Sequence, residues 1–198
     1  MKRIGFKNPI HESLTPATSE ALGRLLIDYQ ELEQVAHLAV PMAFIPIDPV
    51  AAFPLLTTKN LTTIRKLEFS SKLLNLAARR YNVKEVKSKN GLALDMVSRV
   101  LQLEHVELIF ANFRFAVDYA TQLLEYRNSL FHGTATVRDS EVVFVGRNAE
   151  LASGAKQFDE KRDEVIHASL ALYSSAFSVK SALEYLIATP PKSKNPTE

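Results

Sequence analysis

The sequence contains no cysteine, which excludes disulfide bonds, thiolate catalysis, and zinc or iron–sulfur sites built from cysteine. It has only 6 glycines, and it contains no glycine-rich phosphate loop, no serine elbow and no H-E-x-x-H metal motif. No stretch approaches the roughly 20 uninterrupted apolar residues of a membrane span. We therefore expect a soluble cytoplasmic protein without a membrane segment, and no motif calls for a cofactor or a metal.

What is present indicates a folded globular protein. The 198 residues are 46% hydrophobic and 23% charged, which is too apolar for a disordered chain. A chain of this length can bury a sizeable core in one domain, but hardly in two. We expect a single helical domain over residues 1–189, followed by a disordered tail, PPKSKNPTE, at 190–198.

The spacing of apolar residues predicts mostly helix. A first helix begins at Thr15-Pro16, where threonine is a good cap and proline is tolerated in the first turn. Further helices are predicted at about 61–81, at 92–131 as one long helix or two, and at about 159–187. Between the last two, TATVRDSEVVFVG has the pattern of a small β-hairpin. The predicted fold is all-α: an antiparallel bundle of four to five helices with a β-hairpin before the last helix.

Two of these helices have distinctive surfaces. The last is apolar on more than one side, so we expect it to be central in the bundle; its apolar residues are Val165, Leu170, Leu172, Phe177, Val179, Leu183 and Leu186. The helix at 61–81 should turn its apolar residues, Phe69 and Leu76 among them, inward and most of its basic residues outward.

Positive charge is concentrated around that helix. Between Lys59 and Lys89 there are nine basic and two acidic side chains, although the net charge of the whole chain is only +2. Such a block is either an ordinary solvated helix face or a surface that binds a polyanion such as RNA. The residues in the helix that would follow an RNA backbone are Arg65, Lys66, Lys72, Arg79 and Arg80.

Other ionisable residues give weaker signals. Glu33 falls on the apolar stripe of the first helix, so it is either paired in a structural salt bridge or supports a site. Glu164 and His167 have the E-x-x-H spacing of di-iron bundles, but no second pair exists, because Glu33 and His37 are one residue too far apart. We predict no metal site and interpret His37 as an isolated helix-face residue.

The stretch YRNSLFHGTATV, at 126–137, places three versatile polar side chains at the end of a predicted helix. Arg127 lies on an otherwise apolar row, and Asn128 and His132 are four residues apart on one face. Gly133 follows, and glycine just beyond the last turn can adopt the left-handed conformation that stops a helix. The last turn carries the negative end of the helix dipole, which favours cationic side chains such as arginine and protonated histidine.

Arginine and histidine in this arrangement suit the cleavage of a phosphodiester without a metal. Histidine can move a proton between an attacking 2′-hydroxyl and the leaving 5′-oxygen. A guanidinium group can bind the phosphate and the charge that grows on it in the transition state. An internal 2′-hydroxyl nucleophile would make RNA the natural substrate and would leave a 2′,3′-cyclic phosphate. We assign these roles to His132 and Arg127, with Asn128 orienting the imidazole.

The pattern R-N-x-x-x-H-G at the end of a long helix resembles the R-x4-6-H signature of HEPN domains, found in prokaryotic toxins, antiphage proteins and RNA-processing nucleases. The first helix, with LGRLLIDYQELE, and the hairpin after HGT also look like small stand-alone HEPN proteins. The resemblance implies a homodimer whose two motifs share one cleft, and metal-independent endoribonuclease activity. It places Arg127, Asn128 and His132 at the motif positions.

We therefore expect an endoribonuclease that acts as a toxin or antiphage-defence effector and is held in check by an antitoxin or regulatory protein. HEPN domains also include members that do no chemistry. The alternative is thus a non-catalytic module that dimerises or binds nucleotide or RNA, in which Arg127 and Asn128 cap carbonyl groups or pair with a buried acid.

Overall fold

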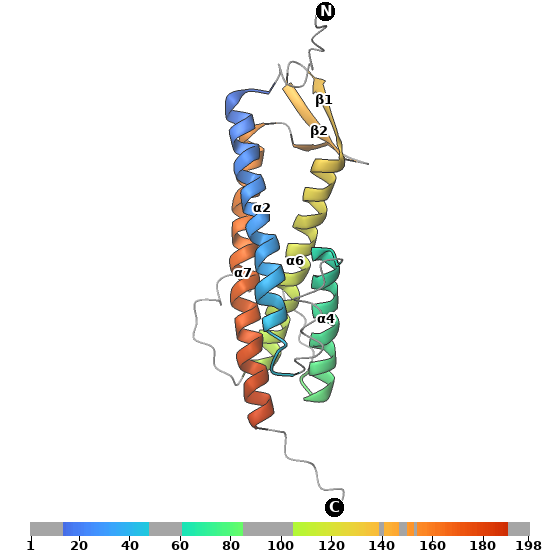
Figure 1. Cartoon of the computed structure of the whole chain (residues 1–198), viewed down its shortest axis with the longest axis vertical. Coiled ribbons are helices and arrows are strands. Elements are labelled where there is room, and N and C mark those ends of the chain that lie inside the picture. Colours follow the sequence, from blue (N-terminus) through green and yellow to red (C-terminus); the bar gives the residue numbers. More distant parts are fainter. Residues whose placement is uncertain are drawn as a thin grey trace, which may run out of the picture. The chain divides into compact units, whose positions relative to one another are not determined.

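The computed structural model describes residues 14–47, 61–84, 105–138, 141–146, 150–152 and 154–189. In these residues four helices and three short strands follow one another along the chain (Figure 1). They are α2 (Pro16–Met42), α4 (Thr63–Arg80), α6 (Val106–His132), β1 (Thr134–Arg138), β2 (Glu141–Val145), β3 (Glu150–Ala152) and α7 (Ala155–Ala188). The predicted helical bundle with a β-hairpin before its last helix is confirmed. The predictions for 92–104 and for the tail at 190–198 lie outside the described residues.

Capping side chains fix the starts of two helices, and the sequence predicted the one at Thr15. The Thr15 hydroxyl accepts a hydrogen bond from the Thr18 backbone N–H at 3.1 Å, and Pro16 needs no partner because it has no N–H. Thr62 accepts from the Arg65 backbone N–H at 3.4 Å and so caps α4. At the other end of α4, Asn82 adopts a φ of 54°, a conformation that asparagine tolerates better than most residues.

The strands form one antiparallel sheet in the order β1-β2-β3. Thr134 lies opposite Val145 in the β1–β2 hairpin, and β3 adds a third strand that the sequence prediction did not include. Val142 and Val143 are buried, and the Phe144 ring meets Phe158 of α7 edge to face, with 5.7 Å between ring centroids. The sheet therefore packs on the first turns of α7.

The described chain divides into two compact units, and α2, α6 and α7 each contribute to both. The first unit ends at Glu31 on α2 and resumes over 122–167; the second takes in 32–121, with α4, and the chain from Ala168 onward. In the second unit Phe44 and Phe113 pack edge to face at 5.8 Å. The core residues of this unit with the largest buried side chains are Leu32, Phe44, Leu67, Leu74, Phe110, Phe113 and Leu172.

Helix directions are mixed, not uniformly antiparallel. In the first unit Arg24 pairs with Asp159 at 3.5 Å, and Asp28, one turn later, pairs with Arg162 at 2.7 Å. Because contacts advance along both helices together, α2 and α7 run in the same direction. The sheet returns the chain from the end of α6 to the start of α7, so these two run in opposite directions (Figure 1). Apolar periodicity predicts a buried face but not the direction of a helix, which explains the difference.

Several apolar residues that the sequence places inside the bundle are exposed. On α4, Phe69 is 40% and Leu76 60% exposed. On α7, Leu170 is 62% and Phe177 59% exposed, whereas Leu172 is fully buried. The last helix therefore buries one of its apolar sides within the described chain and leaves the other at the surface.

Candidate functional site

The R-N-x-x-x-H motif occupies the last two turns of α6, in the first unit. Arg127 Nη1 donates a hydrogen bond to Asn128 Oδ1 at 3.2 Å, and the guanidinium carbon lies 6.0 Å from the centre of the Phe131 ring. Arg127 and Asn128 are half-buried, and His132 is exposed in the final turn. The structure thus holds the guanidinium against its own helix and leaves the imidazole open to solvent.

Asn128, which we predicted to orient His132, contacts Arg127 in the structure: its side-chain oxygen accepts the hydrogen bond from the guanidinium group. Among the described residues none forms a hydrogen bond with the His132 ring. Asn128 and His132 still share a helical face, being four residues apart, so a phosphate lying on that face can reach both. Asn128 thus contacts the arginine, while the His132 side chain is exposed.

Glycine is required at position 133 for a different reason from the one predicted. Its φ does not lie in the left-handed region, so backbone conformation does not require glycine here. A Cβ at this position would lie 2.5 Å from the Val145 carbonyl oxygen of β2 and 2.6 Å from the Ser129 carbonyl oxygen. The close approach of β2 to the end of α6 leaves no room for a side chain. Gly133 therefore allows the hairpin to fold back directly beside His132.

Charged residues of α7 hold the last turns of α6. Lys161 Nζ lies 4.8 Å from the centre of the Tyr126 ring, next to Arg127 in the sequence, and forms an ion pair with Glu164 at 2.6 Å. Burial, and to a lesser degree the Glu164 carboxylate, raises the pKa of the Tyr126 hydroxyl. Glu164 is thus engaged by a lysine, and in the described part of the chain no three metal-ligating side chains cluster.

The basic residues of α4 divide into two groups. Arg65, Lys72, Arg79 and Arg80 are exposed, as predicted for an RNA-contacting surface. Lys66 is only 4% exposed, so the prediction that it contacts RNA is wrong. Residues 63, 67, 70, 74 and 77 form the buried side of α4, and the three-to-four spacing places residue 66 with them.

Lys66 belongs to a polar cluster that the sequence did not indicate. Its ammonium group lies 3.0 Å from His37 Nδ1 on α2, and His37 Nε2 lies 3.3 Å from the Thr63 hydroxyl. An ammonium group only donates, so Nδ1 accepts and the ring proton resides on Nε2. Burial lowers the pKa of His37; the positive charge of Lys66 lowers it further, and Glu33 opposes both. Burial also lowers the pKa of Lys66.

This cluster corrects the interpretation of His37 as an isolated residue and gives Glu33 a setting. Glu33 is half-buried on α2, one turn before His37, and belongs to the second unit. Its negative charge acts on His37. The motif residues lie in the first unit, and the supporting role of Glu33 at the motif site stays a prediction.

Comparisons of the chain with known protein families, with curated proteins and with solved structures find no match. Among the helices that the structure describes, none combines the length and the apolar character needed to cross a bilayer.

Proposed function

We propose that this protein is a metal-independent endoribonuclease. The proposal rests on two side chains at the end of α6. The Arg127 guanidinium group is held by the neighbouring Asn128 amide, and His132 is exposed in the last turn. Both residue types can act on a phosphodiester without a bound metal. The similarity to the HEPN signature supports the same activity.

The residues have separate roles in the proposed reaction. His132 takes the proton from a 2′-hydroxyl and returns a proton to the 5′-oxygen that leaves, so that a 2′,3′-cyclic phosphate remains. Arg127 binds the two non-bridging oxygens of the phosphate, whose negative charge grows in the transition state. Asn128 holds the guanidinium through the 3.2 Å hydrogen bond, so the Arg127 side chain loses less conformational entropy when it binds the phosphate.

Exposed charge on α4 supports RNA as the ligand. Arg65, Lys72, Arg79 and Arg80 form a basic surface that attracts phosphate groups along a strand. An enzyme that cleaves cellular RNA has to be controlled. We therefore place it in the cytoplasm as a toxin or antiphage-defence effector, neutralised by an antitoxin or regulatory protein. These assignments rest on the resemblance.

Mixed RNA incubated with purified protein in EDTA tests the proposal. Wild type should fragment the RNA, and His132→Ala should lower the rate by about 100-fold or more, the usual contribution of an acid–base group. Because His132 is exposed, its replacement should leave the melting temperature nearly unchanged. His167→Ala, which removes another exposed histidine from the first unit, is the matched control and should cleave normally. If wild type and His132→Ala leave the RNA equally intact, the proposal that the protein is an endoribonuclease is refuted.

One observation favours the non-catalytic alternative. The Arg127 guanidinium is already engaged by Asn128 and lies over the Phe131 ring, contacts that a purely structural arginine would also make. In a dimerising or nucleotide-binding module, Arg127→Ala should lower the melting temperature by several degrees and wild type should not cleave RNA. If the protein is a ribonuclease, the Arg127→Ala variant should lose RNA cleavage, and its melting temperature should change only slightly.

A further inference from the structure

Large apolar side chains remain exposed along one side of α2 and α7 in the second unit. Leu170 is 62% exposed, and Tyr173 and Phe177 are each 59% exposed on α7. Leu38 is 62% and Met42 48% exposed on α2. We call these five residues the apolar α2/α7 face. On each helix they recur at intervals of three or four residues, so they form two continuous rows.

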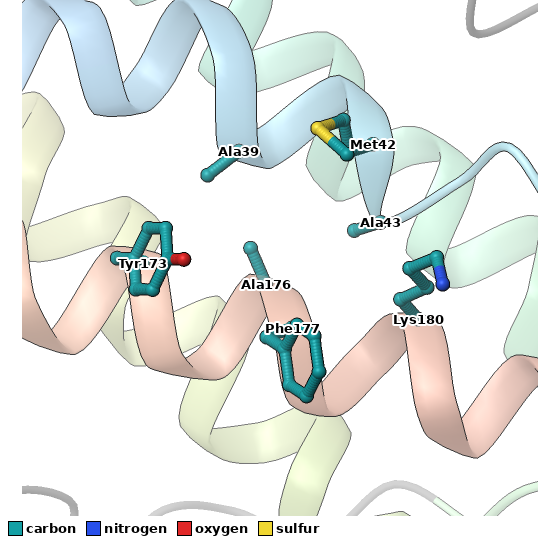
Figure 2. A pocket seen from close by; sticks show the side chains of 7 residues that line it. All are labelled: Ala39, Met42, Ala43, Tyr173, Ala176, Phe177 and Lys180. Atoms are coloured by element: carbon teal, nitrogen blue, oxygen red, sulfur yellow. The ribbon is translucent and has the colours of Figure 1, made fainter.

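A groove runs between the two rows. Figure 2 shows it from close by: the small side chains of Ala39, Ala43 and Ala176 border the space between the helices, and Tyr173 and Phe177 stand beside them. Lys180 lies at the end of the groove. Small residues between rows of large ones make a hollow that can receive a row of large side chains from another helix surface.

The size of this face matches the apolar part of a stable protein interface. A buried aromatic side chain hides about 150–250 Å² of surface. At these exposures the two aromatic and three aliphatic side chains together present on the order of 500 Å² of surface to solvent. An interface of standard size buries about 800 Å² on each partner, of which about 60% is apolar. A patch of this extent is also near the upper end of what a monomer leaves exposed.

The charge pattern favours a second copy of this chain as the partner. From Ala168 to Leu183 the only charged side chain is Lys180, which forms an ion pair with Glu184 at 2.8 Å. Between Glu33 and Ile47 the sequence of α2 and the turn after it contains no Asp, Glu, Lys or Arg. A two-fold axis brings like residues near one another, and this face has no unpaired charge to repel its own copy.

We infer that two copies associate through the apolar α2/α7 face, each placing its row of large side chains against the groove of the other. Both a ridge and a groove lie on the same surface, so a symmetric contact satisfies the two together. The motif residues belong to the first unit and contribute no side chain to this face. The association through the apolar α2/α7 face therefore does not require RNA cleavage, and it differs from the homodimer expected from the HEPN resemblance, in which the two motifs share one cleft.

Sedimentation equilibrium at micromolar concentration tests the inference. Wild type should have twice the 22.1 kDa mass of one chain, and Phe177→Glu should have the single-chain mass with unchanged helical circular dichroism. Leu76→Glu is the matched control: it adds the same charge at a position of α4 that is 60% exposed, and it should remain a dimer.

A milder variant covers the case in which a new glutamate disturbs the helix. Phe177→Ala should raise the dissociation constant of the dimer at least tenfold, as expected for a central aromatic residue of an interface. A wild-type mass of 22.1 kDa overturns the inference, and so does a dimer that Phe177→Ala and Phe177→Glu leave as tight as wild type. RNA cleavage is not measured, so either proposal can fail without the other.

Discussion

At the scale of single residues, Gly133 shows that a glycine can be required by its neighbours and not by its own torsion angles. The residue lies where β2 returns to the end of α6, within reach of two carbonyl oxygens. Its role as a helix stop could be predicted from its place after the motif. The reason could not, because it depends on where Val145, a residue of the next strand, is placed.

Replacing Gly133 by alanine should therefore destabilise the protein. A new Cβ would meet backbone oxygens at 2.5 and 2.6 Å, and backbone moves less readily than a side chain. We expect the free energy of unfolding in urea to fall by about 1–3 kcal/mol. The control is Gly23→Ala within α2, where nothing lies within 4 Å of the new Cβ. Alanine there should raise the free energy of unfolding by about 0.5–1 kcal/mol. Equal effects at the two sites would contradict the close approach.

At the scale of elements, capping residues and apolar spacing predicted the helices well. Thr15 carries a local signal that needs no tertiary contact, and the start of α2 follows from it. The hydrogen bond between Lys66 and His37 joins residues 29 apart in sequence, and neither residue type is distinctive alone. Contacts of this kind depend on how the helices pack, which the periodicity of one helix does not contain.

The Lys66–His37 contact makes the docking of α4 on α2 dependent on pH. Burial and the Lys66 charge lower the pKa of His37 below its ordinary 6.5, with Glu33 opposing. Because the pKa of His37 is lower in the folded protein than in the unfolded chain, the unfolded chain binds the proton more readily as pH falls below about 6.5. The contribution of His37 to the free energy of unfolding is therefore fully present above about pH 6.5 and is lost as pH falls through the folded pKa. Protonation also removes the Nδ1 acceptor and leaves two cations in contact.

Chemical denaturation between about pH 7.5 and 5.5 measures this dependence. Wild type should become less stable as pH falls, and His37→Gln should have a flatter profile. His167→Gln, at an exposed position outside the cluster, should keep the wild-type slope. An unchanged slope in His37→Gln would show that another group controls stability in this range.

At the scale of the whole molecule, the sequence predicted the class of fold, but not how apolar surface is distributed between core and exterior. The apolar character of the last helix on more than one side was interpreted as central burial. In the structure Leu172 is fully buried while Leu170 and Phe177 remain about 60% exposed. A sequence reports how much apolar surface a helix carries, and packing within the chain determines which side it covers. The uncovered side is the basis for the proposed contact between two copies.

The motif at the end of α6 is the basis of the proposed ribonuclease, which is defined by the bond that it breaks. Cleavage by an internal 2′-hydroxyl leaves a 2′,3′-cyclic phosphate on one fragment and a 5′-hydroxyl on the other. Mass spectrometry of RNA fragments made by the wild-type protein in EDTA identifies these ends directly, with His132→Ala purified in parallel to exclude a contaminating nuclease. Cyclic phosphate ends that depend on His132 are the predicted result. Intact RNA, or fragments ending in a 3′-hydroxyl, would contradict the proposed cleavage.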